Sequence, residues 1–249
     1  MVTNLKRLFK KDLSLGTLSL QPILPFKQYN DLNTLGSENL AELLSFSEQR
    51  QFPDLCPEPT GKRVLFFSRR STAKLLANIP TDQASLLVNY QIGDVPLGNT
   101  PLVSVSSPNR PNVYTLKGTF TPLPFRPRYF DILLLPFASS FGNEVLDHLS
   151  SLAGLLGNGG RAVIAVVHPT FEIFLTNQNP SSKARADSSL QAYFTALRDH
   201  DLYLETLLEG VINRENKTFF LQGEALNAGD DILGIPLVLF MRVVKYIKS

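Results

Sequence analysis

The stretch Phe130-Asp-Ile-Leu-Leu-Leu-Pro-Phe137 decides the fold class, because its apolar side chains follow one another without alternation. A run of this kind is typical of a strand buried on both faces, as in a parallel sheet covered by helices. A second apolar run, Arg161-Ala-Val-Ile-Ala-Val-Val-His168, comes after residues 144–156, where apolar side chains recur at helical spacing. Strand, helix and strand in this order predict a parallel unit with a helical crossover.

The segments on both sides continue the alternation of strands and helices. Residues 96–111 contain four prolines and are predicted to form a loop. The last two strands are predicted to form a hairpin at one edge of the sheet. Together the segments predict an α/β fold with a doubly wound, mostly parallel sheet. The further strands are expected at 63–67, 85–91, 113–116, 203–212 and 237–246, and the further helices at 71–79 and 188–199.

The first 60 residues differ from the rest of the chain. Residues 31–51 carry leucines at helical spacing, and the proline-rich stretch 52–61 is predicted to be a connection. We therefore expect an N-terminal helical cap or extension at 1–60, followed by an α/β domain at 61–249.

Composition excludes several classes of function. The net charge is +2, and nothing in the sequence indicates a nucleic-acid surface. One cysteine, Cys56, and three scattered histidines argue against a metal site. The longest apolar runs have the length of strands, so no membrane span is expected. The default expectation is a cytoplasmic protein.

Three stretches give the chain a likeness to a known family. They are Gly118-Thr-Phe-Thr-Pro-Leu-Pro-Phe125 with Phe130-Asp131 after it, Leu155-Leu-Gly-Asn-Gly-Gly-Arg-Ala-Val-Ile164, and Pro236-Leu-Val-Leu-Phe-Met-Arg-Val-Val-Lys245. In this order and spacing, residues 62–249 resemble the class I S-adenosylmethionine (SAM)-dependent methyltransferases, in particular the type 11-like group. The resemblance implies a Rossmann-like sheet of seven strands whose last strand is antiparallel.

The resemblance also implies where the cofactor pocket would lie. The matching positions are Ser68, Arg69, Asn89, Thr119 and Pro136. In the family the first strand ends in an acid and a glycine-rich turn, and two further acids bind the ribose and the adenine amino group. Here the turn has neither glycine nor acid, Asn89 stands at the ribose position, and Thr119 stands at the adenine position. A hydrogen bond to a charged group is worth about 1.5–3 kcal/mol, so losing two such acids weakens SAM binding strongly.

The sequence therefore favours a methyltransferase-like protein with an eroded SAM site, acting as a non-catalytic binding or structural subunit. Another protein is the expected partner, and no cofactor is expected. Two alternatives stay open. The first is an active methyltransferase, with SAM as cofactor in an atypical pocket. The second is an anion-binding module, in which Arg69 and Arg70 stand at the start of a helix. His168 is a candidate general base, although a histidine before proline at the end of a strand is more often a turn residue. No catalytic residue is assigned.

Overall fold

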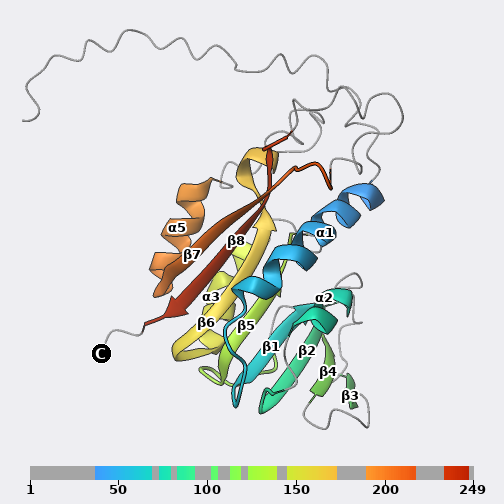
Figure 1. The fold of residues 1–249 in the computed structure, drawn as a ribbon. Helices are drawn as coiled ribbons and strands as arrows, with labels where there is room; N and C mark the ends of the chain where they lie inside the picture. Colours follow the sequence, from blue (N-terminus) through green and yellow to red (C-terminus); the bar gives the residue numbers. More distant parts are fainter. Residues whose placement is uncertain are drawn as a thin grey trace, which may run out of the picture. The chain divides into compact units, whose positions relative to one another are not determined.

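The computed structural model describes residues 37–68, 73–79, 83–92, 102–105, 113–118, 123–138, 145–172, 189–216 and 233–246. All of them belong to one compact unit, Leu35–Ser249. They form a single sheet with helices packed against it (Figure 1). The described helices are α1 (Ser37–Leu55), α2 (Ala73–Asn78), α3 (Val145–Leu155) and α5 (Leu190–Asp199). None of the helices in these residues is long and apolar enough to cross a membrane.

The sheet has eight strands in the order β3-β4-β2-β1-β5-β6-β8-β7. The five strands β4, β2, β1, β5 and β6 are parallel to one another, whereas β3 is antiparallel to β4, and β8 is antiparallel to both β6 and β7. Without the edge strand β3, this is the predicted seven-stranded Rossmann-like sheet with an antiparallel last strand, so the predicted fold class is confirmed. The strands are β1 (Arg63–Ser68), β2 (Leu86–Ile92), β3 (Leu102–Val105), β4 (Val113–Gly118), β5 (Phe130–Pro136), β6 (Leu156–Val167), β7 (Leu202–Val211) and β8 (Pro236–Lys245).

The main core lies between the sheet and the helices α3 and α5. The buried side chains of α3 recur every three or four residues, so one side of the helix covers the sheet. Ser189 caps α5, because its hydroxyl accepts a hydrogen bond from the backbone N–H of Ala192. The helix residues in this core are Val145, Leu149, Leu152, Ala153, Leu155, Tyr193 and Leu197.

Helix α1 contacts β6, β7 and β8 and continues further than expected. It ends at Leu55, so the start of the predicted connection, 52–61, belongs to the helix. Phe52 and Leu55 are buried, and this burial outweighs the cost of Pro53 in the last turn. Gly210 on β7 makes the contact possible, since a Cβ there would lie 2.5 Å from the Ser47 hydroxyl. The division into a cap, 1–60, and a domain, 61–249, stays a prediction.

Two local expectations were wrong. Residues 102–105, within the proline-rich segment 96–111, form strand β3 on β4. The sequence Leu-Val-Ser-Val suits a strand, and the prolines of the segment stand outside it. The sequence predicted a helix over residues 144–156 and a strand that begins at Arg161. Instead β6 already begins at Leu156, which pairs with Phe130, and the register shifts before Arg161.

Candidate functional site

The carboxyl ends of the five parallel strands β4, β2, β1, β5 and β6 lie along one edge of the sheet (Figure 1). Open α/β sheets bind their ligands at this edge. Ser68 ends β1 and lies beside Gln91 of β2, which in turn lies beside Lys117 of β4. Pro136 ends β5 two residues after Leu134, the partner of Phe66, and therefore lies at the level of Ser68. Thus Ser68 and Pro136 are at the same edge.

Asn89 is not at this edge. It pairs with Phe66 and Thr115, and β2 continues for three more residues to Ile92. At about 3.3 Å per residue, Asn89 lies roughly 6–7 Å below the level of Ser68. The β2 residue at the level of Ser68 is Gln91. The remaining predicted positions, Arg69 and Thr119, and the alternative anion site at Arg69 and Arg70 lie outside the described residues.

Tyr90 fills the space beside the end of β4. Its side chain is fully buried, and a Cβ added to Gly118 would overlap the Tyr90 hydroxyl. The ring makes edge-to-face contacts with Phe67 at 5.6 Å and with Phe125 at 5.3 Å between ring centroids. Burial raises the pKa of Tyr90. The packing of Tyr90 is therefore sufficient to explain the glycine at position 118.

Further aromatic rings extend this packing. Phe125 contacts Phe130 at 5.2 Å, and Phe67 contacts Phe137 at 6.2 Å between centroids. Phe67, Phe130 and Phe137 are almost completely buried. We call Phe67, Tyr90, Phe125, Phe130 and Phe137 the aromatic cluster. It extends from Phe130, the first residue of β5, to Phe67, Tyr90 and Phe137, which lie near the carboxyl ends of β1, β2 and β5.

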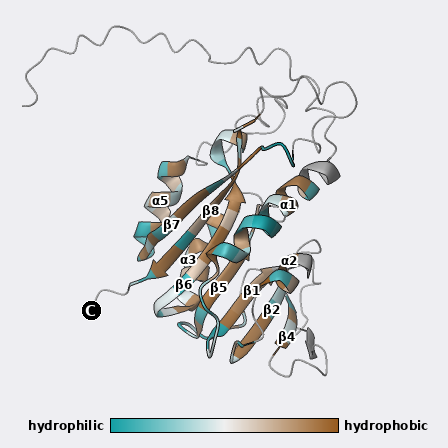
Figure 2. Cartoon of the chain, viewed as in Figure 1, coloured by the Kyte–Doolittle hydropathy of each residue, from teal (hydrophilic) through white to brown (hydrophobic). Residues whose placement is uncertain are grey.

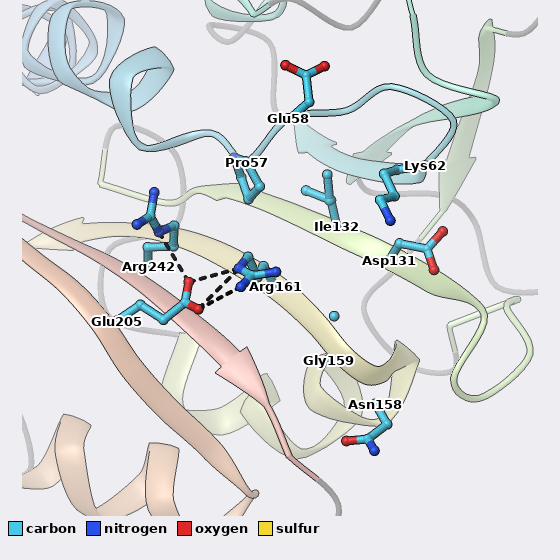
Figure 3. A pocket seen from close by; sticks show the side chains of 11 residues that line it. Pro57, Glu58, Lys62, Asp131, Ile132, Asn158, Gly159, Arg161, Glu205 and Arg242 are labelled. Atoms are coloured by element: carbon cyan, nitrogen blue, oxygen red, sulfur yellow. Dashed lines mark hydrogen bonds and ion pairs between the residues drawn. The ribbon is translucent and has the colours of Figure 1, made fainter.

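A cleft of about 490 Å³ opens at the opposite edge, where β5 and β6 begin (Figure 3). Its walls carry three basic and three acidic side chains. Of the predicted pocket positions that the structure describes, Ser68, Asn89 and Pro136, none lines it. The lining residues are Pro57, Glu58, Lys62, Asp131, Ile132, Asn158, Gly159, Gly160, Arg161, Glu205 and Arg242.

Two ion-pair groups organise this amino-edge cleft. Arg161 donates to both carboxylate oxygens of Glu205, at 2.9 Å and 3.2 Å from Nε, and Arg242 Nε lies 3.3 Å from the same carboxylate. Arg63 donates through Nε and Nη2 to Asp131 at 3.0 Å and 2.9 Å. These bonds lower the pKa of Asp131 and raise that of Arg161. No group of metal-binding side chains occurs in the part of the chain that the structure describes.

No family model matches the chain, and no curated protein matches it either. Solved structures do match. A protein assigned as a SAM-dependent methyltransferase from Listeria monocytogenes aligns with a TM-score of 0.55 at 14% identity, covering 83% of this chain and 100% of its own. A SAM-dependent methyltransferase from Mesorhizobium loti aligns with a TM-score of 0.52 at 14% identity, over 78% and 97%. A methyltransferase from Haloferax volcanii, solved with the Trm112 methyltransferase activator, aligns with a TM-score of 0.56 at 17% identity, over 90% and 97%.

The chain has the class I methyltransferase-like fold. At these identities the likeness concerns the fold alone, so the chemistry must be argued from the residues of this methyltransferase-like chain. At the level of Ser68, the described neighbours on β2 and β4 are Gln91 and Lys117, and neither side chain is an acid.

His168, the candidate general base, has both ring nitrogens engaged. Its Nδ1 accepts a hydrogen bond from the backbone N–H of Thr170 at 3.1 Å, so the ring proton of the neutral form lies on Nε2. Nε2 lies 3.1 Å from Glu209 Oε1 and donates to it. Burial lowers the pKa of His168, and the hydrogen bond to Glu209 acts in the opposite direction. In this arrangement the side chain joins β6 to β7 and has no nitrogen available to take a proton from a substrate.

Sequence reasoning missed Glu48, a buried acid on α1. Its side chain is 1% exposed, and Oε1 accepts a hydrogen bond from the backbone N–H of Ala138 at 2.9 Å, just after β5. Leu44, Glu48 and Phe52 follow at intervals of four residues, so they share one side of the helix. This spacing in the sequence indicates that Glu48 lies on the buried side of the helix.

Proposed function

We propose that this methyltransferase-like chain transfers no methyl group and serves as a binding or structural subunit for another protein. The observation that carries the proposal is the position of Tyr90. Its hydroxyl lies against Gly118, the residue before Thr119, the position that the resemblance assigns to adenine contact. An aromatic side chain of this chain thus takes up space beside the proposed nucleoside position.

The magnitude of the effect supports a loss of SAM affinity. Binding adenosine beside Gly118 requires Tyr90 to leave its buried position, which costs about 1.5–3 kcal/mol for a side chain of this size. A missing carboxylate costs about 1.5–3 kcal/mol more. Since about 1.4 kcal/mol is a factor of ten in Kd, the two effects together weaken binding by about two to four powers of ten.

Isothermal titration of the full chain with SAM and with S-adenosylhomocysteine tests the proposal. We expect no heat of binding at millimolar concentrations of either compound. A known methyltransferase, titrated in the same buffer, serves as the positive control. Binding with a micromolar Kd would refute the proposal and favour an enzyme with an atypical pocket.

The outer strand β7 supports the second half of the proposal, that the chain binds a protein. Its apolar side chains Tyr203, Leu204, Leu207 and Leu208 are each 37–42% exposed, and Tyr246 is 53% exposed. Consecutive residues of a strand point to opposite faces, so Leu207 and Leu208 place exposed apolar groups on both faces of β7. Figure 2 shows hydrophobic residues along this strand. Exposed apolar groups on an edge strand are typical of a surface that another chain covers. The Haloferax volcanii neighbour was itself solved with a protein partner.

A further inference from the structure

We propose that the amino-edge cleft binds a small organic molecule through an oxyanion group, a carboxylate or a phosphate. The cleft lies at the end of the sheet opposite to the carboxyl edge, so this inference goes beyond the proposed function and does not depend on SAM binding. Its volume of about 490 Å³ is within the usual range for small-molecule sites, about 300–1,000 Å³.

The first observation is a surplus of positive charge beside Asp131. Asp131 accepts both side-chain bonds from Arg63, and a further bond from the Arg63 backbone N–H at 2.9 Å. Arg63 is not part of the cleft lining, so it neutralises Asp131 from outside. Lys62 lines the cleft and is exposed, and its charge is not needed to balance Asp131.

Glu58, the second acid near Lys62 in the cleft lining, does not neutralise the charge of Lys62. The Glu58 carboxylate accepts hydrogen bonds from the backbone N–H and the hydroxyl of Thr60, at 3.1 Å and 2.5 Å. It points away from the other charged side chains of the cleft (Figure 3). Asp131 is the cleft acid beside Lys62 in Figure 3, and it already pairs with Arg63, so Arg63, Lys62 and Asp131 together carry one net positive charge.

The second observation is that the Glu205 carboxylate is the shared ion-pair partner of two guanidinium groups, those of Arg161 and Arg242. Glu205 forms a two-pronged bond with Arg161, which leaves Arg242 with a single ion contact of 3.3 Å from Nε. Arg242 Nε is buried, and among the described residues it makes no hydrogen bond of good geometry. The terminal nitrogens of Arg242 point away from Glu205 in Figure 3, while its side chain remains 32% exposed. The group of three carries one net positive charge.

Two glycines contribute only backbone to the wall of the cleft. Gly159 and Gly160 form part of the wall and carry no side chain. Gly160 cannot be replaced without strain, because a Cβ would lie 2.9 Å from the carbonyl oxygen of Gly157. Pro57 and Ile132 supply apolar wall. A ligand with a small hydrocarbon body and an anionic group fits this combination, and the planar fork of arginine suits carboxylate and phosphate oxygens.

Titration of the full chain with citrate and, separately, with inorganic phosphate tests the inference. The melting temperature and the chemical shifts of arginine side-chain N–H groups are followed while sodium chloride keeps the ionic strength constant. We expect saturable shifts with at least one anion, and the arm that saturates at lower concentration identifies carboxylate or phosphate as the preferred group. Absence of a saturable shift with both anions at millimolar concentration would overturn the inference.

Matched variants locate the binding. R242Q is expected to weaken anion binding about tenfold or more, as expected for the loss of a charged hydrogen bond. K62Q gives a second test, because Lys62 is exposed and its replacement leaves the ion pairs of the fold intact. R198Q is the control of equal charge loss, since Arg198 lies on α5, outside the cleft lining, and its side chain is 73% exposed. Equal anion affinity in K62Q, R198Q and the unaltered chain would contradict the inference even if R242Q fails to fold.

Discussion

The Tyr90 hydroxyl occupies the space that a side chain at position 118, at the end of β4, would need. The Tyr90 ring is held by Phe67 and Phe125, so it cannot move aside easily when a methyl group is added to Gly118. We expect Gly118→Ala to lower the free energy of unfolding by about 1–3 kcal/mol, the usual cost of overpacking. Urea unfolding followed by tyrosine fluorescence measures the change.

Gly154→Ala is the matched control for this prediction. Gly154 lies in α3, and a Cβ there meets nothing within 4 Å. Alanine is the better helix former by about 0.8–1 kcal/mol, so this control is expected to unfold at a higher urea concentration. A Gly118→Ala chain as stable as the unaltered one would show that Tyr90 is not confined as described.

His168 makes stability depend on pH in the range below its ordinary pKa. Burial lowers the pKa of His168 in the folded chain, so the unfolded chain binds the proton more tightly. Its contribution is fully present above the unfolded pKa, about 6.5, and is lost as the pH falls through the folded pKa. We expect His168→Gln to show a smaller loss of stability between pH 7 and pH 5, measured by urea unfolding at each pH. His200→Gln is the control for the loss of a histidine outside the contact with Glu209.

At the scale of elements, β7 is an edge strand with exposed apolar side chains on both faces. Leu204 and Leu208 are 41% and 42% exposed, so lysine at both positions removes apolar surface without emptying the core. We expect L204K/L208K to bind less of a fluorescent apolar dye and to scatter less light at high concentration than the unaltered chain. The melting temperature is expected to change little, because exposed substitutions usually alter stability by about 0.5 kcal/mol or less. Unchanged dye binding would show that the apolar surface lies elsewhere.

The strands of this fold were predicted well where burial is continuous. Runs such as 130–137 and 161–168 carry their own signal, since a strand covered on both faces needs apolar residues at every position. The strand expected at 85–91 lies within one residue of β2, but the burial of Tyr90 near its end was not predicted, because it depends on contacts with rings of two other segments. The same reason explains β3, whose four residues become a strand only by pairing with β4.

At the scale of the whole molecule, the resemblance predicted a mostly parallel sheet with an antiparallel last strand but left the functional site to be found. Of its pocket positions, Ser68 and Pro136 lie at the carboxyl edge, where the described residues offer packed aromatic rings and a buried acid, Glu48. The amino-edge cleft depends on Lys62, Asp131, Arg161 and Arg242, which are far apart in the chain. No spacing rule in the sequence joins such positions, because only the strand order brings them together. The cleft was therefore outside the reach of sequence reasoning.

The contact between Gly210 and Ser47 couples the edge strand β7 to β5, near the middle of the sheet, through helix α1. A side chain at position 210 would push Ser47, and with it the helix, away from β7. The next residue of that helix is Glu48, whose carboxylate would then withdraw from the Ala138 N–H at the end of β5. That backbone group would be left buried without its acceptor. A methyl group added at position 210 on the edge strand β7 would thus disturb a hydrogen bond at the end of β5, three strands away, because α1 contacts both places.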